Sequence, residues 1–190
     1  MVQQPVANPA DEWDKAAEGL AGLNEYIGEI TQARFMVASE AYGQPASFGE
    51  SCVIVLETTV ESAIDPADFP HETTKIILSV GKIENWTILD GGLSIKNSKG
   101  GGLGNSKYQL FIARTTKELK VPIKERGISP FNAAAWPGLR FHFKREAQPI
   151  PKNLLREGGP TESYTMLPIQ WMQNTMPPLV VASATAQPAQ

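Results

Sequence analysis

Cysteine and histidine are scarce in this chain of 190 residues, which contains one cysteine and two histidines. A single cysteine, Cys52, cannot form an internal disulfide, which fits a reducing compartment. His71 and His142 lie far apart, and no Cys/His ligand spacing or HExxH motif accompanies them. A Gly-x-Ser-x-Gly nucleophile motif is also missing. The sequence therefore predicts no catalytic residues, no metal site and no cofactor, and we interpret the protein as a non-enzyme.

Long apolar runs and targeting signals are missing as well. No apolar stretch approaches the roughly 18 residues that a membrane helix needs. The first residues, MVQQPVANPADEWDK, contain neither the basic segment nor the apolar segment of a signal peptide. We therefore expect a cytoplasmic protein with no membrane partner, located in the host cytoplasm if the chain is viral.

Basic residues are scarce in the first half of the chain, and acidic residues are scarce in the segment that follows it. Residues 1–95 contain four basic and fifteen acidic residues, a net charge of −11. Residues 96–145 contain eleven basic and two acidic residues, a net charge of +9, although the whole chain carries only −3. A concentrated basic region indicates binding to a polyanion or to the acidic face of a partner.

Apolar and β-branched runs predict a mainly β protein with one or two helices, of the α+β class. A helix beginning at Asn105 or Ser106 and ending near Lys120 follows the strands of the N-terminal half. Pro168 indicates an edge strand or a bulge. The expected strands are 30–42, 51–61, 73–80, a hairpin over 86–95 that turns at Asp90-Gly91-Gly92, 139–145 and 163–172. About five strands with a helix between the third and fourth is the order of an oligonucleotide/oligosaccharide-binding (OB) barrel, with a β-sandwich as the alternative.

The composition predicts three parts along the chain. Residues 1–29 read as an acidic N-terminal arm with a short helix over about Asp11 to Leu23. Residues 30–173 contain the strands of the OB-like barrel domain. Residues 174–190 are rich in proline and alanine and are expected to form a disordered tail. Both termini are therefore expected to be flexible.

The candidate binding residues come from the basic region and its aromatic neighbours. Strand alternation places Leu139, Phe141 and Phe143 on a core face and Arg140, His142 and Lys144 on the opposite face. Single-strand binders combine a basic groove with exposed aromatic rings on which bases stack. The predicted cations are Lys96, Lys99, Lys107, Arg114, Arg140, Lys144 and Arg145, and the predicted stacking platforms are Trp86 and Tyr108, with core packing as the alternative for both rings.

A glycine-rich loop precedes the predicted helix and resembles a phosphate loop only superficially. In Gly104-Asn105-Ser106-Lys107 the lysine follows the serine, whereas a P-loop requires Gly-Lys-Ser/Thr. We therefore interpret residues 96–107 as a flexible connection or as a mobile basic loop that contacts a nucleic-acid backbone.

Four segments carry a resemblance to a known family. Val80-Gly81 ends a strand, Trp86 to Gly92 reads WTILDGG, Asn105 to Phe111 opens the helix, and Trp136 to His142 opens the basic strand. Over about residues 30–172 the chain resembles the OB-type single-stranded DNA-binding proteins of bacteriophages. The resemblance implies binding led by the nucleic-acid backbone, without a diagnostic motif. Bacterial-type members end in an acidic tail, whereas this chain has no acidic residue after Glu162.

Three functional hypotheses follow. The first is a single-stranded nucleic-acid-binding protein of low sequence specificity, acting on DNA or RNA in replication or recombination, in a phage. The second is a viral capsid or decoration protein whose acidic and basic faces dock between copies as a homo-oligomer. A third reading, in which the acidic half mimics nucleic acid as an inhibitor, ranks last.

Overall fold

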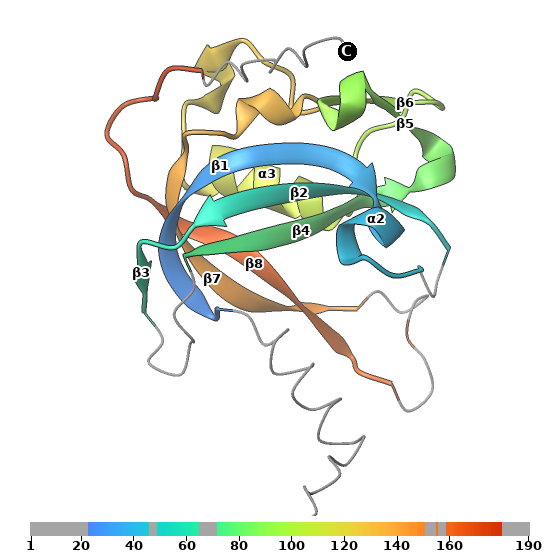
Figure 1. Ribbon diagram of the computed structural model, residues 1–190, viewed down its shortest axis with the longest axis horizontal. Helices are drawn as coiled ribbons and strands as arrows, with labels where there is room; N and C mark the ends of the chain where they lie inside the picture. Colours follow the sequence, from blue (N-terminus) through green and yellow to red (C-terminus); the bar gives the residue numbers. More distant parts are fainter. Residues whose placement is uncertain (1–22, 46–48, 65–71, 151–154, 156–158, 180–190) are drawn as a thin grey trace, which may run out of the picture.

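Five long antiparallel strands form the main sheet of the protein (Figure 1). The computed structural model describes residues 23–45, 49–64, 72–150, 155 and 159–179. The strands are β1 (Glu25–Val37), β2 (Ser51–Thr59), β4 (Thr73–Lys82), β7 (Arg140–Pro149) and β8 (Glu162–Trp171), with the short β3 (Ser62–Ala63) paired to the start of β1. A separate hairpin consists of β5 (Trp86–Leu89) and β6 (Ser94–Asn97).

The pairing order of the long strands is β4-β2-β1-β7-β8. The central strand β1 therefore joins β2 and β4, which precede helix α3 in the chain, to β7 and β8, which follow it. The predicted α+β class is confirmed, with α2 (Ala38–Tyr42) and α3 (Lys107–Ala113) as the two α-helices of the described residues. The predicted barrel closure is not found, because no pairing joins the described parts of β8 and β4.

Local sequence explains the boundaries of α3. The Ser106 hydroxyl accepts the N–H of Gln109 at 3.1 Å and caps the helix, as predicted. The predicted continuation to Lys120 is not α-helical, because residues 114–118 widen into a π-helical turn. The hydroxyls of Thr115 and Thr116 each donate to the carbonyl four residues earlier at 2.8 Å, which competes with the regular backbone pattern.

Strand β7 follows the predicted alternation. Phe141 and Phe143 are fully buried, whereas Lys144 on the other face is exposed. Pro168 lies on β8, which is an edge strand, and the pairing of β7 with β8 shifts register at this point. Both parts of the proline prediction are therefore confirmed.

Several predicted boundaries were wrong. The strand expected at residue 30 begins at Glu25, so the boundary between arm and domain falls inside β1, and residues 38–42 form α2 instead of continuing the strand. A short 3₁₀ helix, Ala133–Ala135, is capped by Asn132, whose side chain accepts the Ala134 N–H. The tail begins in contact with the domain, because Met176 packs against the core and the Arg126 guanidinium donates to the Pro177 carbonyl at 3.2 Å. The predicted helix over residues 11–23 and residues 180–190 lie outside the described residues.

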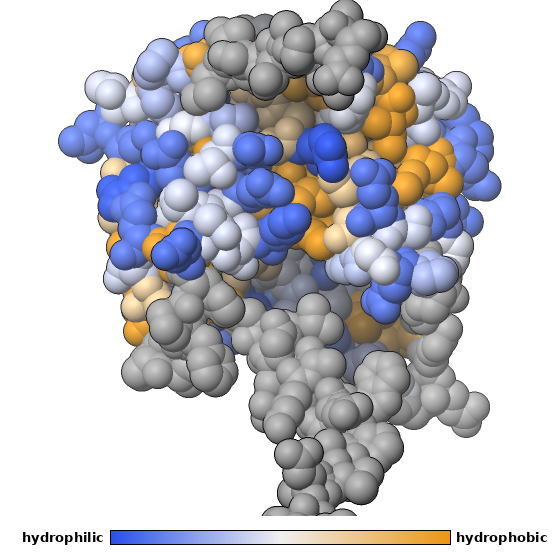
Figure 2. Space-filling model, viewed as in Figure 1, coloured by the Kyte–Doolittle hydropathy of each residue, from blue (hydrophilic) through white to orange (hydrophobic). Residues whose placement is uncertain are grey.

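The core occupies the concave side of the sheet and is closed by α3 and the turns around Trp136 (Figure 1). Trp136 contacts Tyr108 and Phe111 edge-on, with ring centroids 6.0 and 5.0 Å away. A second, smaller apolar cluster lies on the opposite face of β1 and β2 and consists of Met36, Ala38, Val53 and Val55. Figure 2 shows hydrophobic side chains among hydrophilic ones at the centre of this face.

Candidate nucleic-acid interface

The predicted basic ridge of β7 is paired with acidic side chains from the N-terminal half. Glu25 lies opposite Lys144 in the antiparallel register. Its carboxylate contacts the Lys144 ammonium at 2.9 Å and the His142 ring at 2.8 Å. Arg140 binds Glu61 next to β3, and its Nε lies 2.8 Å from both carboxylate oxygens. Part of the charge asymmetry of the sequence is therefore explained by ion pairs that join β1 and the residue before β3 to β7.

These contacts change the proton affinities of the paired groups. The hydrogen bond from Lys144 holds the pKa of Glu25 below its usual value, aided by His142 and opposed by partial burial. The hydrogen bonds from Glu61 raise the pKa of Arg140. Arg140 and Lys144 therefore have partners within the chain, and the basic ridge expected on this face of β7 is neutralised in part by Glu25 and Glu61.

Replacing Glu25 with glutamine is expected to lower the free energy of unfolding by about 1 kcal/mol at neutral pH. Because the pKa of Glu25 is lower in the folded state, its contribution is present above pH 4.5, the usual pKa, and disappears as the pH falls through the folded-state pKa. Urea titrations over this range should therefore show the gap between wild type and variant closing in acid. Glu84→Gln, an exposed control, should show no gap; a gap for Glu25→Gln that is independent of pH would contradict this role.

Two further predicted cations are also engaged. Arg114 makes a double hydrogen bond to Glu146, with N–O distances of 3.1 and 2.8 Å, and an ion pair with Glu118. The Lys107 ammonium donates to the backbone carbonyl of Tyr164 at 2.9 Å, and its burial lowers its pKa. Lys107 therefore fastens α3 to the edge strand β8.

The two predicted stacking rings lie in the core. Tyr108 is fully buried, and its hydroxyl accepts the Trp136 indole N–H at 2.9 Å. Trp86 is 6% exposed and packs against Phe131, with ring centroids 5.8 Å apart. Bases stack on exposed rings, so neither side chain serves as a platform. The alternative of core packing is the correct one for both.

Lys96 and Lys99 are the predicted cations that remain exposed and unpaired. They lie on β6 and in the turn that follows it. Neither ammonium makes an ion pair with any residue in the described ranges. Both are therefore available to an anionic ligand.

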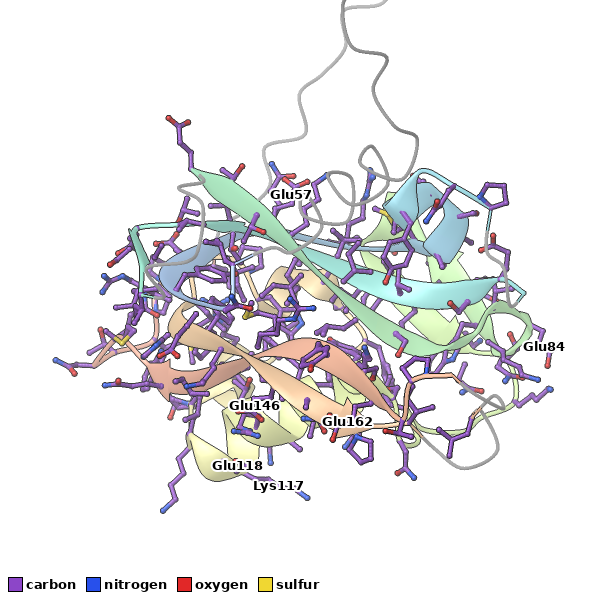
Figure 3. All side chains as sticks on the ribbon, turned by 90° about the horizontal axis from the view of Figure 1, so that it is seen from below. Glu57, Glu84, Lys117, Glu118, Glu146 and Glu162 are labelled. Carbon is purple, nitrogen blue, oxygen red and sulfur yellow. The ribbon has the colours of Figure 1, made fainter. Side chains whose placement is uncertain are left out.

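A groove of about 500 Å³ lies between the two edge strands, β4 and β8. Figure 3 shows these two strands from below. Tyr42 at the end of α2 and Tyr164 on β8 both line it, and each is 55% exposed. The Arg145 guanidinium lies over the Tyr164 ring, 4.6 Å from its centroid. Lys75 on β4 adds a cation that pairs with Glu57 at 3.4 Å. The groove thus combines two accessible rings with cations of two strands.

Of these groove residues, only Arg145 is among the binding residues predicted from the sequence. A signal for Tyr164 exists, because alternation along β8 places buried Thr165 and Leu167 on one face and Tyr164 on the other. Tyr42 was missed because residues 38–42 were interpreted as the end of a strand, whereas they form α2. The position of β4 opposite β8 across the groove depends on the tertiary fold and not on neighbouring residues in the sequence.

Comparison with protein-family models, with curated proteins and with solved structures finds no match for this chain. Among the described residues, no helix is long and apolar enough to cross a membrane. No group of three or more His, Cys, Asp or Glu side chains in those same ranges is arranged to hold a metal ion.

Proposed function

We propose that this protein binds single-stranded nucleic acid with low sequence specificity through the groove between β4 and β8. The observation that carries the proposal is the exposed Tyr164 ring with the Arg145 guanidinium over it, inside a groove that also exposes Tyr42. Base–aromatic stacking contributes about 1–3 kcal/mol per base and tolerates any base, because every base has a π face. Cations beside the rings neutralise the phosphates between stacked bases.

The order of the strands supports an OB-like frame for this function. In chain order the five long strands are arranged 3-2-1-4-5, with α3 after the third. A partly open OB barrel has the same order, and it binds oligonucleotides on strands 2 and 3 and on the loops that follow strands 1 and 4. Here the third strand, β4, lines the groove, Tyr42 belongs to the connection after the first strand, and Tyr164 follows the connection after the fourth.

Contacts between the cations of the protein and the phosphates of the nucleic acid predict that the affinity falls as the salt concentration rises. Arg145 and Lys75 lie in the groove, and Lys96 and Lys99 are exposed beyond it. For single strands the logarithm of the binding constant falls with the logarithm of the salt concentration by about 0.7 per neutralised phosphate. A protein with these properties protects exposed strands during replication or recombination of DNA, and the same chemistry accepts RNA.

The test is fluorescence anisotropy of a labelled single-stranded oligonucleotide of about 30 nucleotides, a length that exceeds the site of one OB-sized domain. Tyr164→Ala is expected to weaken binding about tenfold, because one stacking surface disappears. Tyr164→Phe keeps the ring and should bind like the wild type. Leu93→Ala, which removes an exposed side chain of the β5–β6 hairpin outside the groove, should leave affinity unchanged.

Two results would contradict the proposal. One is the absence of binding by the wild-type protein even at low salt. The other is equal binding by Tyr164→Ala and wild type, which would place the nucleic acid away from the groove. The competing hypothesis of capsid assembly has lost part of its support, because acidic and basic side chains of the two halves pair within one chain at β1, β3 and β7.

A further inference from the structure

A small apolar cleft lies under the π-helical turn, separate from the groove. It is lined by Ile112 and Thr116 from α3 and the turn, by Ile123 and Ile128 from the segment that follows, and by Trp136 at its base. Its volume is about 120 Å³. An apolar protein cavity of about 150 Å³ binds one benzene ring, so this open cleft can accept the edge of one bulky apolar side chain.

The cleft has a cationic rim. Lys124 lines it, and Lys117 and Lys120 lie in the chain between its lining residues Thr116 and Ile123; the three are called the rim lysines. All three are exposed, and none makes an ion pair or side-chain hydrogen bond with a residue of the described ranges. In Figure 3 Lys117 points away from the body of the protein. Lys124 therefore places a positive charge at an apolar opening, and Lys117 and Lys120 add two more on the same segment of the chain, against the one acidic side chain there, Glu125, that is unpaired among the described residues.

The backbone at this rim is unusual in two respects. The helix widens into a π turn over residues 114–118, a feature that is frequent at functional sites. Lys120 then adopts a left-handed conformation, with φ of 54°, which costs free energy for a residue other than glycine. Strained positions of this kind cluster at ligand-binding sites. Both features define the backbone that carries the rim lysines.

The chemistry of the cleft selects an acidic segment with one bulky apolar side chain, and the chain itself contains such a segment. Residues 11–18 read DEWDKAAE, in which Asp11, Glu12 and Asp14 flank Trp13. We propose that the cleft binds this acidic segment of a second copy, with the edge of the Trp13 ring in the cleft and the carboxylates on the rim lysines. The contact joins different surfaces of two copies, so it repeats head to tail along a row of molecules.

Sedimentation velocity of the full-length protein without nucleic acid tests this proposal. The wild type is expected to self-associate with rising concentration, and high salt should weaken the association because the contact includes exposed charges. Trp13→Ala should weaken it about tenfold, since a buried aromatic anchor dominates small interfaces. Reversal of both Lys96 and Lys99 to glutamate changes charge away from the cleft and should leave association unchanged.

A charge exchange makes the test specific. One variant has the three rim lysines changed to glutamate, and the other has Asp11, Glu12 and Asp14 changed to lysine. Each variant alone should be monomeric, with a circular dichroism spectrum like that of the wild type. An equimolar mixture should associate, because the reversed cleft then meets the reversed segment. A wild type that stays monomeric at every concentration would overturn the proposal, and so would two folded variants that fail to associate when mixed. Neither result bears on nucleic-acid binding, which the oligonucleotide titration measures separately.

Discussion

Replacing Trp136 with alanine is expected to lower the free energy of unfolding by about 3–5 kcal/mol, a large part of the stability of a typical domain. Trp136 is 1% exposed and contacts both Tyr108 and Phe111. Alanine leaves a cavity where these rings meet and removes the N–H that the Tyr108 hydroxyl accepts. For a chain of this length the midpoint of thermal unfolding should fall by roughly 10 °C, which calorimetry measures directly.

Trp136→Phe separates packing from hydrogen bonding. Phenylalanine keeps most of the apolar contact but cannot donate to Tyr108, whose own hydroxyl continues to donate to the Pro130 carbonyl. We expect it to cost about 1–2 kcal/mol, well below the alanine variant. Equal losses for the two variants would mean that the hydrogen bond, and not the packing of the ring, is the main contribution.

Replacing Gly28 with alanine is expected to cost about 3 kcal/mol or to prevent folding, because the new methyl group has no space. A Cβ atom at this position would lie 1.9 Å from the Thr59 carbonyl oxygen. The obstacle is backbone, so a change of side-chain rotamer cannot relieve it, and β1 would have to move away from the end of β2. Urea denaturation followed by circular dichroism gives the loss.

Gly102→Ala is the matched control for Gly28→Ala. A Cβ atom at Gly102 would meet no atom within 4 Å. The substitution should be neutral or slightly stabilising, because alanine reduces the freedom of the unfolded chain. A Gly28→Ala variant as stable as Gly102→Ala would contradict the close approach of β1 to Thr59.

Elements that depend on local patterns could be predicted from the sequence. The alternation in β7, the turn at Asp90-Gly91-Gly92 between β5 and β6, and the Ser106 cap each depend on a few neighbouring residues. The start of β1 at Glu25 was missed although Tyr26, Gly28 and Ile30 are buried in alternation with Glu25 and Glu29. Here the signal was present, but the acidic residues were assigned to a separate arm.

Features that depend on distant residues could not be predicted in this way. Net charge by segment identified the basic region but could not show that Glu25 and Glu61 approach β7, because Glu25 and His142 are 117 residues apart and Glu61 and Arg140 are 79 residues apart. The groove likewise requires β4 and β8 to face each other. Of the predicted site residues, Arg145 is therefore in the groove, Lys96 and Lys99 are free, and the others have partners or lie in the core.

The central place of β1 has a consequence for synthesis of the chain on the ribosome. Its partner β2 follows shortly, but its other partner, β7, begins only at Arg140. At about 5–20 residues per second, roughly 5–20 s pass between the emergence of the two strands. During that time one edge of β1 is open to pairing with other nascent chains, a contact that charged side chains on an edge discourage. Glu25 and Glu29 lie on the part of β1 that later pairs with β7. Their charges therefore discourage pairing between nascent chains before β7 has been made, and in the folded protein the same carboxylates lie near the β7 cations.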